Sequence, residues 1–192
     1  GSGNLRAASA PEPADVFIVA VPTPLTDDKR ADMNYVIRAT ESIVSHLRKG
    51  NLVILESTSP PGTCRDLLKP ILERSGLRVG ADLFLAHCPE RVLPGKILQE
   101  LIRNDRVIGG YDVASAEMAR DLYARFVEGK VFLTDVTTAE MVKIVENTYR
   151  DVNIALANEA ALLCERLGID FWEVARYANR HPRVNVHTAG PG

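Results

Sequence analysis

The run Leu-Phe-Leu-Ala-His-Cys-Pro-Glu-Arg-Val-Leu-Pro-Gly at residues 83–95 joins a short apolar segment to a rigid turn that carries adjacent acidic and basic side chains. Its apolar part, Leu83 to Ala86, is typical of a buried strand. In α/β proteins, functional side chains often follow the carboxyl end of such a strand. Taken alone, the turn at Cys88–Gly95 is also compatible with an ordinary loop that holds a surface ion pair. The rest of the sequence has to decide between a functional site and such a loop.

Similar apolar runs alternate with helical patterns through the first two thirds of the chain. The predicted strands are residues 15–21, 51–55, 83–86, 106–108 and 131–133. The predicted helices between them are residues 33–49, 63–75, 96–103 and 115–127. This alternation favours an α/β fold, with a parallel sheet flanked by helices and ligands at the carboxyl ends of the strands. We therefore expect part of a Rossmann-like domain at residues 15–136.

From Thr137 the pattern changes to one uninterrupted helical stretch of roughly thirty residues, which ends near Gly168. The segment Thr137-Thr138-Ala139-Glu140 resembles a capping signal, a hydroxyl followed by an acid in the first turn. A second helix is predicted from Asp170 to Asn179. A helix as long as the first usually spans two domains or a subunit interface. We expect a central helical dimerisation domain at 137–180, followed by a loop at 181–192.

The composition is that of a globular protein: 192 residues, 46% hydrophobic, with a formal net charge of −2. It excludes disordered and collagen-like classes, and the absence of a basic block gives no sign of a nucleic-acid or membrane surface. No apolar run approaches the thickness of a bilayer and no leader is visible, so we expect a cytoplasmic protein. Three cysteines without paired or metal-like spacing predict free thiols and no metal site.

Lys143, Asn147 and Arg150 fall at i, i+4 and i+7 of the long predicted helix, so they share one face. Such a stripe can be simply solvated. It can also form the wall of a site, because a lysine beside an amide and an arginine binds phosphate or stabilises an oxyanion.

Three loops offer further candidates, each with a plain structural alternative. Ser57-Thr58 follows a predicted strand, where hydroxyls either bind a dinucleotide or cap the next helix. Val21-Pro22-Thr23-Pro24 has fixed dihedrals that lay backbone near a ligand. Residues 179–183, Asn-Arg-His-Pro-Arg, are suited to a pyrophosphate, or are an exposed helix end whose cations complement the helix dipole.

Taken together and in order, these segments resemble the UDP-glucose/GDP-mannose dehydrogenase family. The segments that carry the resemblance are Val-Pro-Thr-Pro at 21–24, Leu-Glu-Ser-Thr-Ser-Pro at 55–60, Cys-Pro-Glu-Arg-Val-Leu-Pro-Gly at 88–95, Asn-Asp-Arg-Val-Ile-Gly-Gly at 104–110, Lys-x-x-x-Asn at 143–147 and Asn-Arg-His-Pro-Arg-Val-Asn at 179–185. The third and the last look most like the branch of the family that acts on UDP-N-acetyl-D-mannosamine.

The resemblance implies an NAD-dependent enzyme that oxidises C6 of a UDP-sugar twice, through an aldehyde and a cysteine thioester that water hydrolyses. In that scheme Thr23, Ser57 and Thr58 contact NAD, and Thr58 also positions a water or the C6 hydroxyl. Glu90 assists hydrolysis as a base. Lys143 stabilises the oxyanion or donates a proton. Residues implied to contact the substrate, some of them from across a dimer, are Arg91, Val92, Lys143, Asn147, Arg150, His181 and Arg183.

The sequence departs from the family at both ends. Family members begin with a strand, a Gly-rich phosphate loop and an acidic residue for the ribose. They continue beyond Gly-Pro-Gly to a Gly-Gly-x-Cys nucleophile and a second, UDP-binding domain. We therefore expect a chain cut at both ends, with a tag remnant and lead-in at 1–14, residues 181–192 leading towards the missing UDP-binding domain, and no activity in isolation.

Individual positions depart from the family as well. None of Cys64, Cys88 and Cys164 lies in the context of the nucleophile. Pro94 stands where much of the family has a second acid, as expected of the mannosamine branch.

Two alternatives stay open from the sequence. In the first, the chain is an interaction module whose long helix serves only as a dimerisation surface. In the second, it is part of a different enzyme. That enzyme would be another UDP-sugar 6-dehydrogenase of the same family, or a dehydrogenase of the β-hydroxyacid type, which also pairs a Rossmann domain with a long helix and a Lys-x-x-x-Asn stripe. The segments at 88–95 and 179–185 argue against the β-hydroxyacid type.

Overall fold

The computed structural model describes residues 5–92 and 95–191. The segment Gly1-Ser2-Gly3, predicted to be a tag remnant, and Pro94 lie outside these ranges. The chain forms two compact units, residues 1–143 and 144–192, which are described separately. The long helix begins at Val136, and the two units divide within it, between Lys143 and Ile144.

The first unit is built on a five-stranded sheet with the strand order β1-β2-β3-β4-β5. The strands are β1 (Val16–Val19), β2 (Leu52–Leu55), β3 (Phe84–His87), β4 (Arg106–Gly110) and β5 (Val131–Asp135). β1, β2 and β3 are parallel and in register, so Val19 lies beside Leu55, and Leu55 beside His87. The carboxyl ends of these three strands therefore meet at one edge of the sheet.

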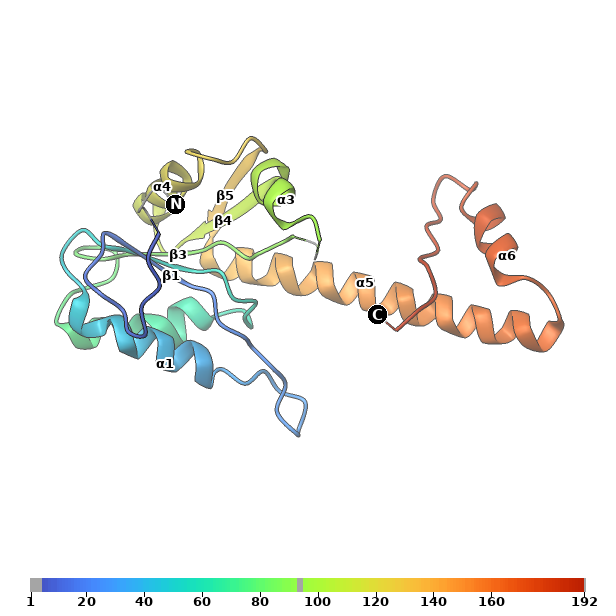
Figure 1. Ribbon diagram of the computed structural model, residues 1–192, viewed down its shortest axis with the longest axis horizontal. Coiled ribbons are helices and arrows are strands. Elements are labelled where there is room, and N and C mark those ends of the chain that lie inside the picture. The colour runs from blue at the N-terminus through green and yellow to red at the C-terminus, as the bar shows by residue number, and fades with distance from the viewer. Residues whose placement is uncertain (1–4, 93–94, 192) are drawn as a thin grey trace. The chain divides into compact units, whose positions relative to one another are not determined.

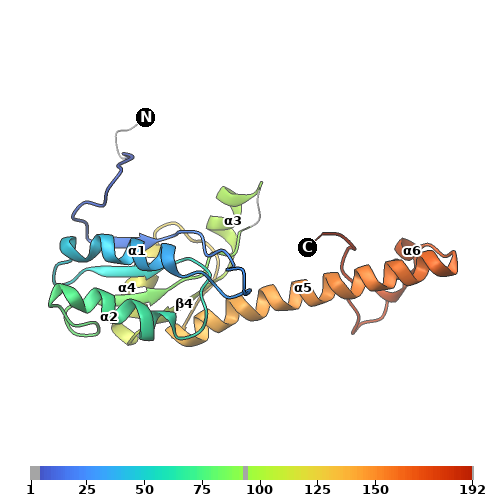
Figure 2. The same ribbon diagram turned by 90° about the horizontal axis from the view of Figure 1, so that it is seen from below.

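The junction between β3 and β4 is antiparallel, whereas β4 and β5 are again parallel. The predicted Rossmann-like α/β fold is confirmed, but a wholly parallel sheet is not. The cause is helix α3 (Ile97–Arg103), which has no buried residue and lies off the sheet in both views (Figures 1 and 2). Because this segment does not cross a sheet face, the chain re-enters at the edge it left and β4 runs the opposite way.

Helices cover both faces of the sheet (Figure 1). On one face lie α1 (Asn34–Ile43) and the helical stretch formed by η2 (Thr63–Leu68), α2 (Lys69–Leu72) and η3 (Glu73–Ser75). They pack on Val53, Leu55 and Leu85, all with no exposed area. On the other face α4 (Val113–Tyr123) covers Ile54, Ala86 and Ile108. Alternate strand residues thus supply two separate apolar layers.

The predicted helices are present with shorter bounds. The helix expected at 33–49 is α1 followed by one tight turn, η1 (Val44–His46), and residues 47–50 are not helical. The helix expected at 63–75 opens with a π-helical segment, η2. Pro70 lies at the start of α2, where a missing N–H costs little.

The adjacent Gly109 and Gly110 allow helices to approach both faces of β4. A Cβ on Gly109 would lie 2.4 Å from the Asp135 carbonyl oxygen and 2.7 Å from the Ala139 Cβ. A Cβ on Gly110 would lie 2.4 Å from the Ala116 nitrogen. Real Cβ atoms do not approach other atoms this closely, so both positions require glycine.

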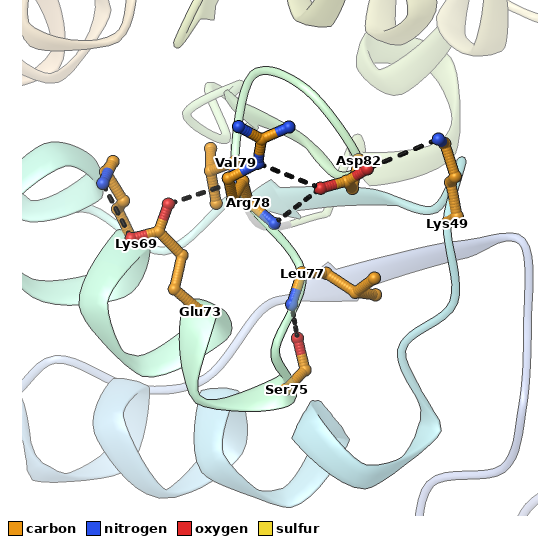
Figure 3. A network of polar contacts seen from close by, with 8 residues as sticks. All are labelled: Lys49, Lys69, Glu73, Ser75, Leu77, Arg78, Val79 and Asp82. Carbon is orange, nitrogen blue, oxygen red and sulfur yellow. Dashed lines mark hydrogen bonds and ion pairs between the residues drawn. The ribbon is translucent and has the colours of Figure 1, made fainter.

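The amino end of β3 is held by a polar network of side chains (Figure 3). Asp82 accepts a hydrogen bond from the Arg78 backbone N–H at 3.1 Å and lies 3.5 Å from the Lys49 ammonium. Glu73 accepts from the Val79 N–H at 3.1 Å. This network fixes the connection from η3 to β3 at the edge opposite the strand exits.

Helix α5 (Val136–Leu167) runs unbroken for 32 residues, as the sequence predicts (Figure 2). Its predicted cap is wrong. Asp135 accepts from the Thr138 N–H at 3.0 Å, so Asp135 takes the place expected of Thr137. Glu140 binds elsewhere, as described below. In the part of the chain that the structure describes, no helix is both long and apolar enough to cross a membrane.

The second unit contains the rest of α5, helix α6 (Phe171–Ala178) and the segment that follows. Ala157, Cys164 and Phe171 are its buried apolar residues, and Val186 and Ala189 pack against them. Segment 181–190 is thus held on a small core although it has no regular secondary structure.

Candidate active site at the strand exits

The segments that leave β1, β2 and β3 are joined to one another just beyond the strands. The Ser57 hydroxyl accepts a hydrogen bond from the Val21 N–H at 2.8 Å and donates one to the Val21 carbonyl at 2.7 Å. The Glu90 N–H donates to the Glu56 carbonyl at 3.3 Å. Three motifs that are distant in the sequence therefore share one edge of the sheet, as expected for a ligand site in an α/β protein.

These bonds separate the roles of the three hydroxyl residues predicted to contact NAD. Ser57 is buried and its hydroxyl is used to hold the exit of β1. Thr23 and Thr58 are half-buried, and neither hydroxyl has a hydrogen bond within residues 5–92 and 95–191. Thr23 and Thr58 therefore remain free to bind a ligand, whereas Ser57 positions the loops around them.

A cluster of buried polar side chains supports the turn that begins at Cys88. The Arg106 guanidinium, 5% exposed, lies 4.8 Å above the ring of Tyr123 and donates to Cys88 Sγ at 3.6 Å. The Tyr123 hydroxyl donates to Glu56 Oε1 at 2.5 Å. Burial raises the pKa of both the Tyr123 phenol and the Cys88 thiol, so each stays protonated at neutral pH. Cys88 is thus a core thiol.

Glu90, Arg91 and Val92 are half-buried at the surface of this cluster. Glu90 Oε1 accepts from the Arg91 N–H at 2.6 Å. The Arg91 guanidinium donates to the Asp105 carbonyl at 3.0 Å. Arg91 therefore ties the turn to the segment before β4.

His87 ends β3 as a fully buried imidazole, and neither ring nitrogen has a partner among the described residues. Burial lowers its pKa to about 4, so the ring is neutral at physiological pH. His87 lies opposite Gly109 on β4, and a Cβ on Gly109 would face Ala139 of α5. The imidazole therefore shares the sheet face against which α5 begins.

Glu140 connects α5 to the exit of β2. Its carboxylate has no exposed area and accepts from the Gly62 N–H at 2.5 Å and the Cys64 N–H at 2.8 Å. Burial raises the pKa of Glu140, and the two N–H donors oppose that shift. Lys143, the predicted cation of the site, is half-buried three residues further along α5. Glu140 therefore fixes the turn of α5 that carries Lys143.

The remaining predicted substrate residues belong to the second unit. Arg150 donates to Asn147 Oδ1 at 3.0 Å, as expected if the two side chains share one face of α5. His181 and Arg183 are exposed, and the His181 Nδ1 accepts from the Arg183 N–H at 3.3 Å. No group of three His, Cys, Asp or Glu side chains in the described parts of the chain is arranged to hold a metal ion.

Several residues that organise this site have local patterns that predict other roles. The patterns around Arg106 and Tyr123 predict only a strand and a helix, and the pattern around Glu140 predicts a cap. A signal for Arg106 does exist, since an arginine at the start of an otherwise apolar strand needs buried partners. Nothing in the local sequence signals the long-range bond of Glu140 to Gly62 and Cys64.

Two domains of one protein family together match most of the chain. Residues 1–127 match the NAD binding domain of the UDP-glucose/GDP-mannose dehydrogenase family, and residues 137–192 match its central domain. The chain belongs to this family. The strand exits described above thus lie within its NAD binding domain.

Individual relatives are similar over the whole chain. A UDP-N-acetyl-D-mannosamine dehydrogenase from Methanocaldococcus jannaschii is 55% identical over 100% of this chain and 44% of its own length. The solved structure of a UDP-N-acetyl-mannosamine dehydrogenase from Staphylococcus aureus has 52% identity and a TM-score of 0.93, over 100% of this chain and 47% of that one.

An NDP-N-acetyl-D-galactosaminuronic acid dehydrogenase from Ralstonia solanacearum is 49% identical over 99% of this chain and 47% of its own length. This chain therefore spans less than half the length of these relatives.

The residues at the strand exits have side chains of the type that hydrogen-bond NAD. They provide two open hydroxyls, Thr23 and Thr58, at the carboxyl ends of adjacent parallel strands. This is the edge at which nucleotide ligands bind in doubly wound sheets.

Proposed function

We propose that this chain is part of an NAD-dependent UDP-N-acetyl-D-mannosamine 6-dehydrogenase, which oxidises the C6 alcohol to a carboxylate in two steps. The observation that carries the proposal is the joining of three family motifs at one sheet edge through Ser57–Val21 and Glu56–Glu90. Similarity to relatives with this name, at 55% and 52% identity, supports the choice of substrate. Another UDP-sugar is the alternative, since the galactosaminuronic acid relative is nearly as similar.

NAD, when bound, accepts the hydride that leaves C6 of the sugar. Thr23 and Thr58 hydrogen-bond the dinucleotide, and Ser57 keeps their loops together. Thr58 also orients the C6 hydroxyl or a water. The Lys143 ammonium stabilises the negative charge that develops on the C6 oxygen. Glu90 accepts a proton from the water that hydrolyses the cysteine thioester.

Arg91 and Val92 line the sugar side of the pocket in this scheme, and Asn147 holds the substrate by its amide. Arg150, His181 and Arg183 bind the charged nucleotide, because guanidinium and imidazole groups are good partners for phosphate. The support for His181 and Arg183 is their place in a family motif and their exposure, and the support for Arg150 is its bond to Asn147 on the same face of α5.

The test uses a protein of the relatives' full length that carries this sequence. NADH formation is followed with UDP-N-acetylmannosamine, UDP-N-acetylgalactosamine and UDP-glucose. Lys143→Ala is expected to lower kcat about 10²-fold or more, because it removes a charge that acts in the transition state. Lys49→Ala at the opposite edge is the control and should leave kcat unchanged. Turnover of UDP-glucose alone would refute the substrate, and full activity of Lys143→Ala would refute the mechanism.

We also propose that the protein is a homodimer formed through α5. Apolar side chains on this helix are 48–64% exposed: Met141, Val145, Tyr149, Val152, Leu156 and Leu167. A second copy of the same helix is a suitable partner, because an exposed apolar face of this kind marks an interface. Light scattering of Leu156→Asp should show a monomer. A Leu156→Asp protein that stays dimeric would refute the interface.

A cytoplasmic location and a role in supplying an acidic sugar for polysaccharide assembly complete the proposal. Three buried free thiols, Cys64, Cys88 and Cys164, support a reducing compartment. Fractionation of cells that express the protein tests the location. Loss of sugar uronate from the cell polysaccharide on deletion of the gene tests the role.

A further inference from the structure

Segment 181–190 follows α6 without helix or strand, yet its backbone is held at two points by asparagine side chains. Both asparagines belong to helices of the same compact unit, Asn158 to α5 and Asn179 to the end of α6. This segment carries His181 and Arg183, so the contacts that hold its backbone also position these two residues.

Each asparagine amide makes two hydrogen bonds to one residue. Asn158 Nδ2 donates to the Gly190 carbonyl at 2.8 Å, and Asn158 Oδ1 accepts from the Gly190 N–H at 2.8 Å. Asn179 Nδ2 donates to the Val186 carbonyl at 3.0 Å, and Asn179 Oδ1 accepts from the Val186 N–H at 2.6 Å. A side-chain amide has one acceptor and one donor side, and here it pairs with a residue's backbone as a neighbouring strand would.

Apolar packing supports the same two points. Val186, itself a clamped residue, and Ala189, which precedes the clamped Gly190, pack on the core formed by Ala157, Cys164 and Phe171. The ring of His187 lies 5.6 Å from that of Tyr149 in an edge arrangement. Because Asn179 bonds Val186, the segment between these two residues forms a closed loop, in which His181 and Arg183 are exposed.

We propose that Asn158 and Asn179 are positioning residues that hold this loop in the conformation required to bind the nucleotide part of the substrate. They act through the backbone at Gly190 and Val186 and do not touch the substrate themselves. The proposal rests on the proposed function, since that function makes His181 and Arg183 substrate contacts.

The direct test is amide hydrogen exchange on the 192-residue chain. Asn158→Ala should speed exchange at Gly190 by about tenfold, and Asn179→Ala should do so at Val186, as expected for a lost hydrogen bond. Aspartate variants keep the acceptor and lose the donor, so their rates should fall between those of wild type and alanine. Asn153→Ala is the matched control, because the side chain of Asn153 bonds, among the described residues, only to Tyr149 of its own helix. Unchanged rates at Gly190 and Val186 would overturn the clamps.

The functional readout is a comparison of Michaelis constants in a full-length protein with this sequence. Asn158→Ala and Asn179→Ala should raise KM for the UDP-sugar about tenfold while KM for NAD and the far-ultraviolet dichroism stay constant. A merely structural role would change both constants or neither, and either result overturns the positioning role. If the wild-type enzyme oxidises no UDP-sugar, the proposed function fails instead, and hydrogen exchange still decides the clamps.

Discussion

Replacing Glu140 with alanine removes the buried carboxylate that holds the start of α5 to the exit of β2. The change leaves the N–H groups of Gly62 and Cys64 buried without an acceptor. Each orphaned donor costs about 1–3 kcal/mol, so the free energy of unfolding should fall by about 2–6 kcal/mol. With a urea dependence of about 2 kcal/mol/M, the midpoint of unfolding should move down by about 1–3 M.

Glu140→Gln removes the charge and keeps one of the two acceptor oxygens, because Gly62 and Cys64 bind different oxygens of the carboxylate. Burial raises the pKa of Glu140 above its ordinary value of 4.5, so the native state binds the proton more tightly than the unfolded chain. The stabilising contribution of this group is therefore fully present below pH 4.5 and is lost as the pH rises through the folded-state pKa. Glutamine does not titrate, so the stability difference between wild type and Glu140→Gln should shift in favour of the variant as the pH rises from 4.5 to neutrality.

Urea unfolding followed by circular dichroism at several pH values measures both effects. Glu165→Ala, an exposed acid on the same helix, is the control and should change stability by less than about 0.5 kcal/mol. If Glu140→Ala were as stable as this control, the bonds to Gly62 and Cys64 would not hold the helix. A pH-independent difference between wild type and Glu140→Gln would refute the effect of burial on the carboxylate.

Three further changes test other parts of the first unit. Gly109→Ala should lower stability by more than about 2 kcal/mol in thermal unfolding, because the new Cβ would meet backbone at 2.4 Å, whereas Gly190→Ala meets nothing within 4 Å and should be nearly neutral. Tyr123→Phe removes the 2.5 Å bond to Glu56 and should cost about 1–2 kcal/mol in urea unfolding; no loss would show that the bond contributes nothing. The hydrogen bond from the Arg78 backbone N–H is the main cause that lowers the pKa of Asp82 below 3.8. The Asp82 carboxylate therefore stabilises the fold above pH 3.8, and this stabilisation is lost as the pH falls through the folded-state pKa. Asp82→Asn should therefore lose less stability than wild type on acidification from pH 5 to 3, and parallel curves would contradict this.

The strands and helices of this fold are predictable because their apolar periodicity is strong. Each of the five predicted strands is present within a few residues, and so is the long helix α5. The antiparallel junction was missed because α3 has the local pattern of a crossover helix although no residue of it is buried. Periodicity over seven residues does not show which surface a helix covers, or whether it covers one.

The site was predictable as a set of motifs but not as a set of contacts. Strand exits gather at one edge, so Thr23, Thr58 and Glu90 could be grouped from their positions after strands. The hydroxyl of Ser57 has the same local signal as that of Thr58 but turns inward to Val21. Which of two neighbouring hydroxyls faces a ligand depends on the path of another strand, and no local sequence pattern encodes that path.

Adjacent glycines in β4 also affect how strand pairing is specified. Successive residues of a strand face opposite sides, and a slip of one residue would bring Ile108 into the place of Gly109, or Tyr111 into the place of Gly110. Neither place admits even a Cβ, so the glycine pair excludes both slipped alignments. The buried Arg106 with its bond to Cys88 and the fully enclosed Ile108 favour the same alignment. The glycine pair and the arginine beneath the Cys88 turn together keep β4 from sliding along β3.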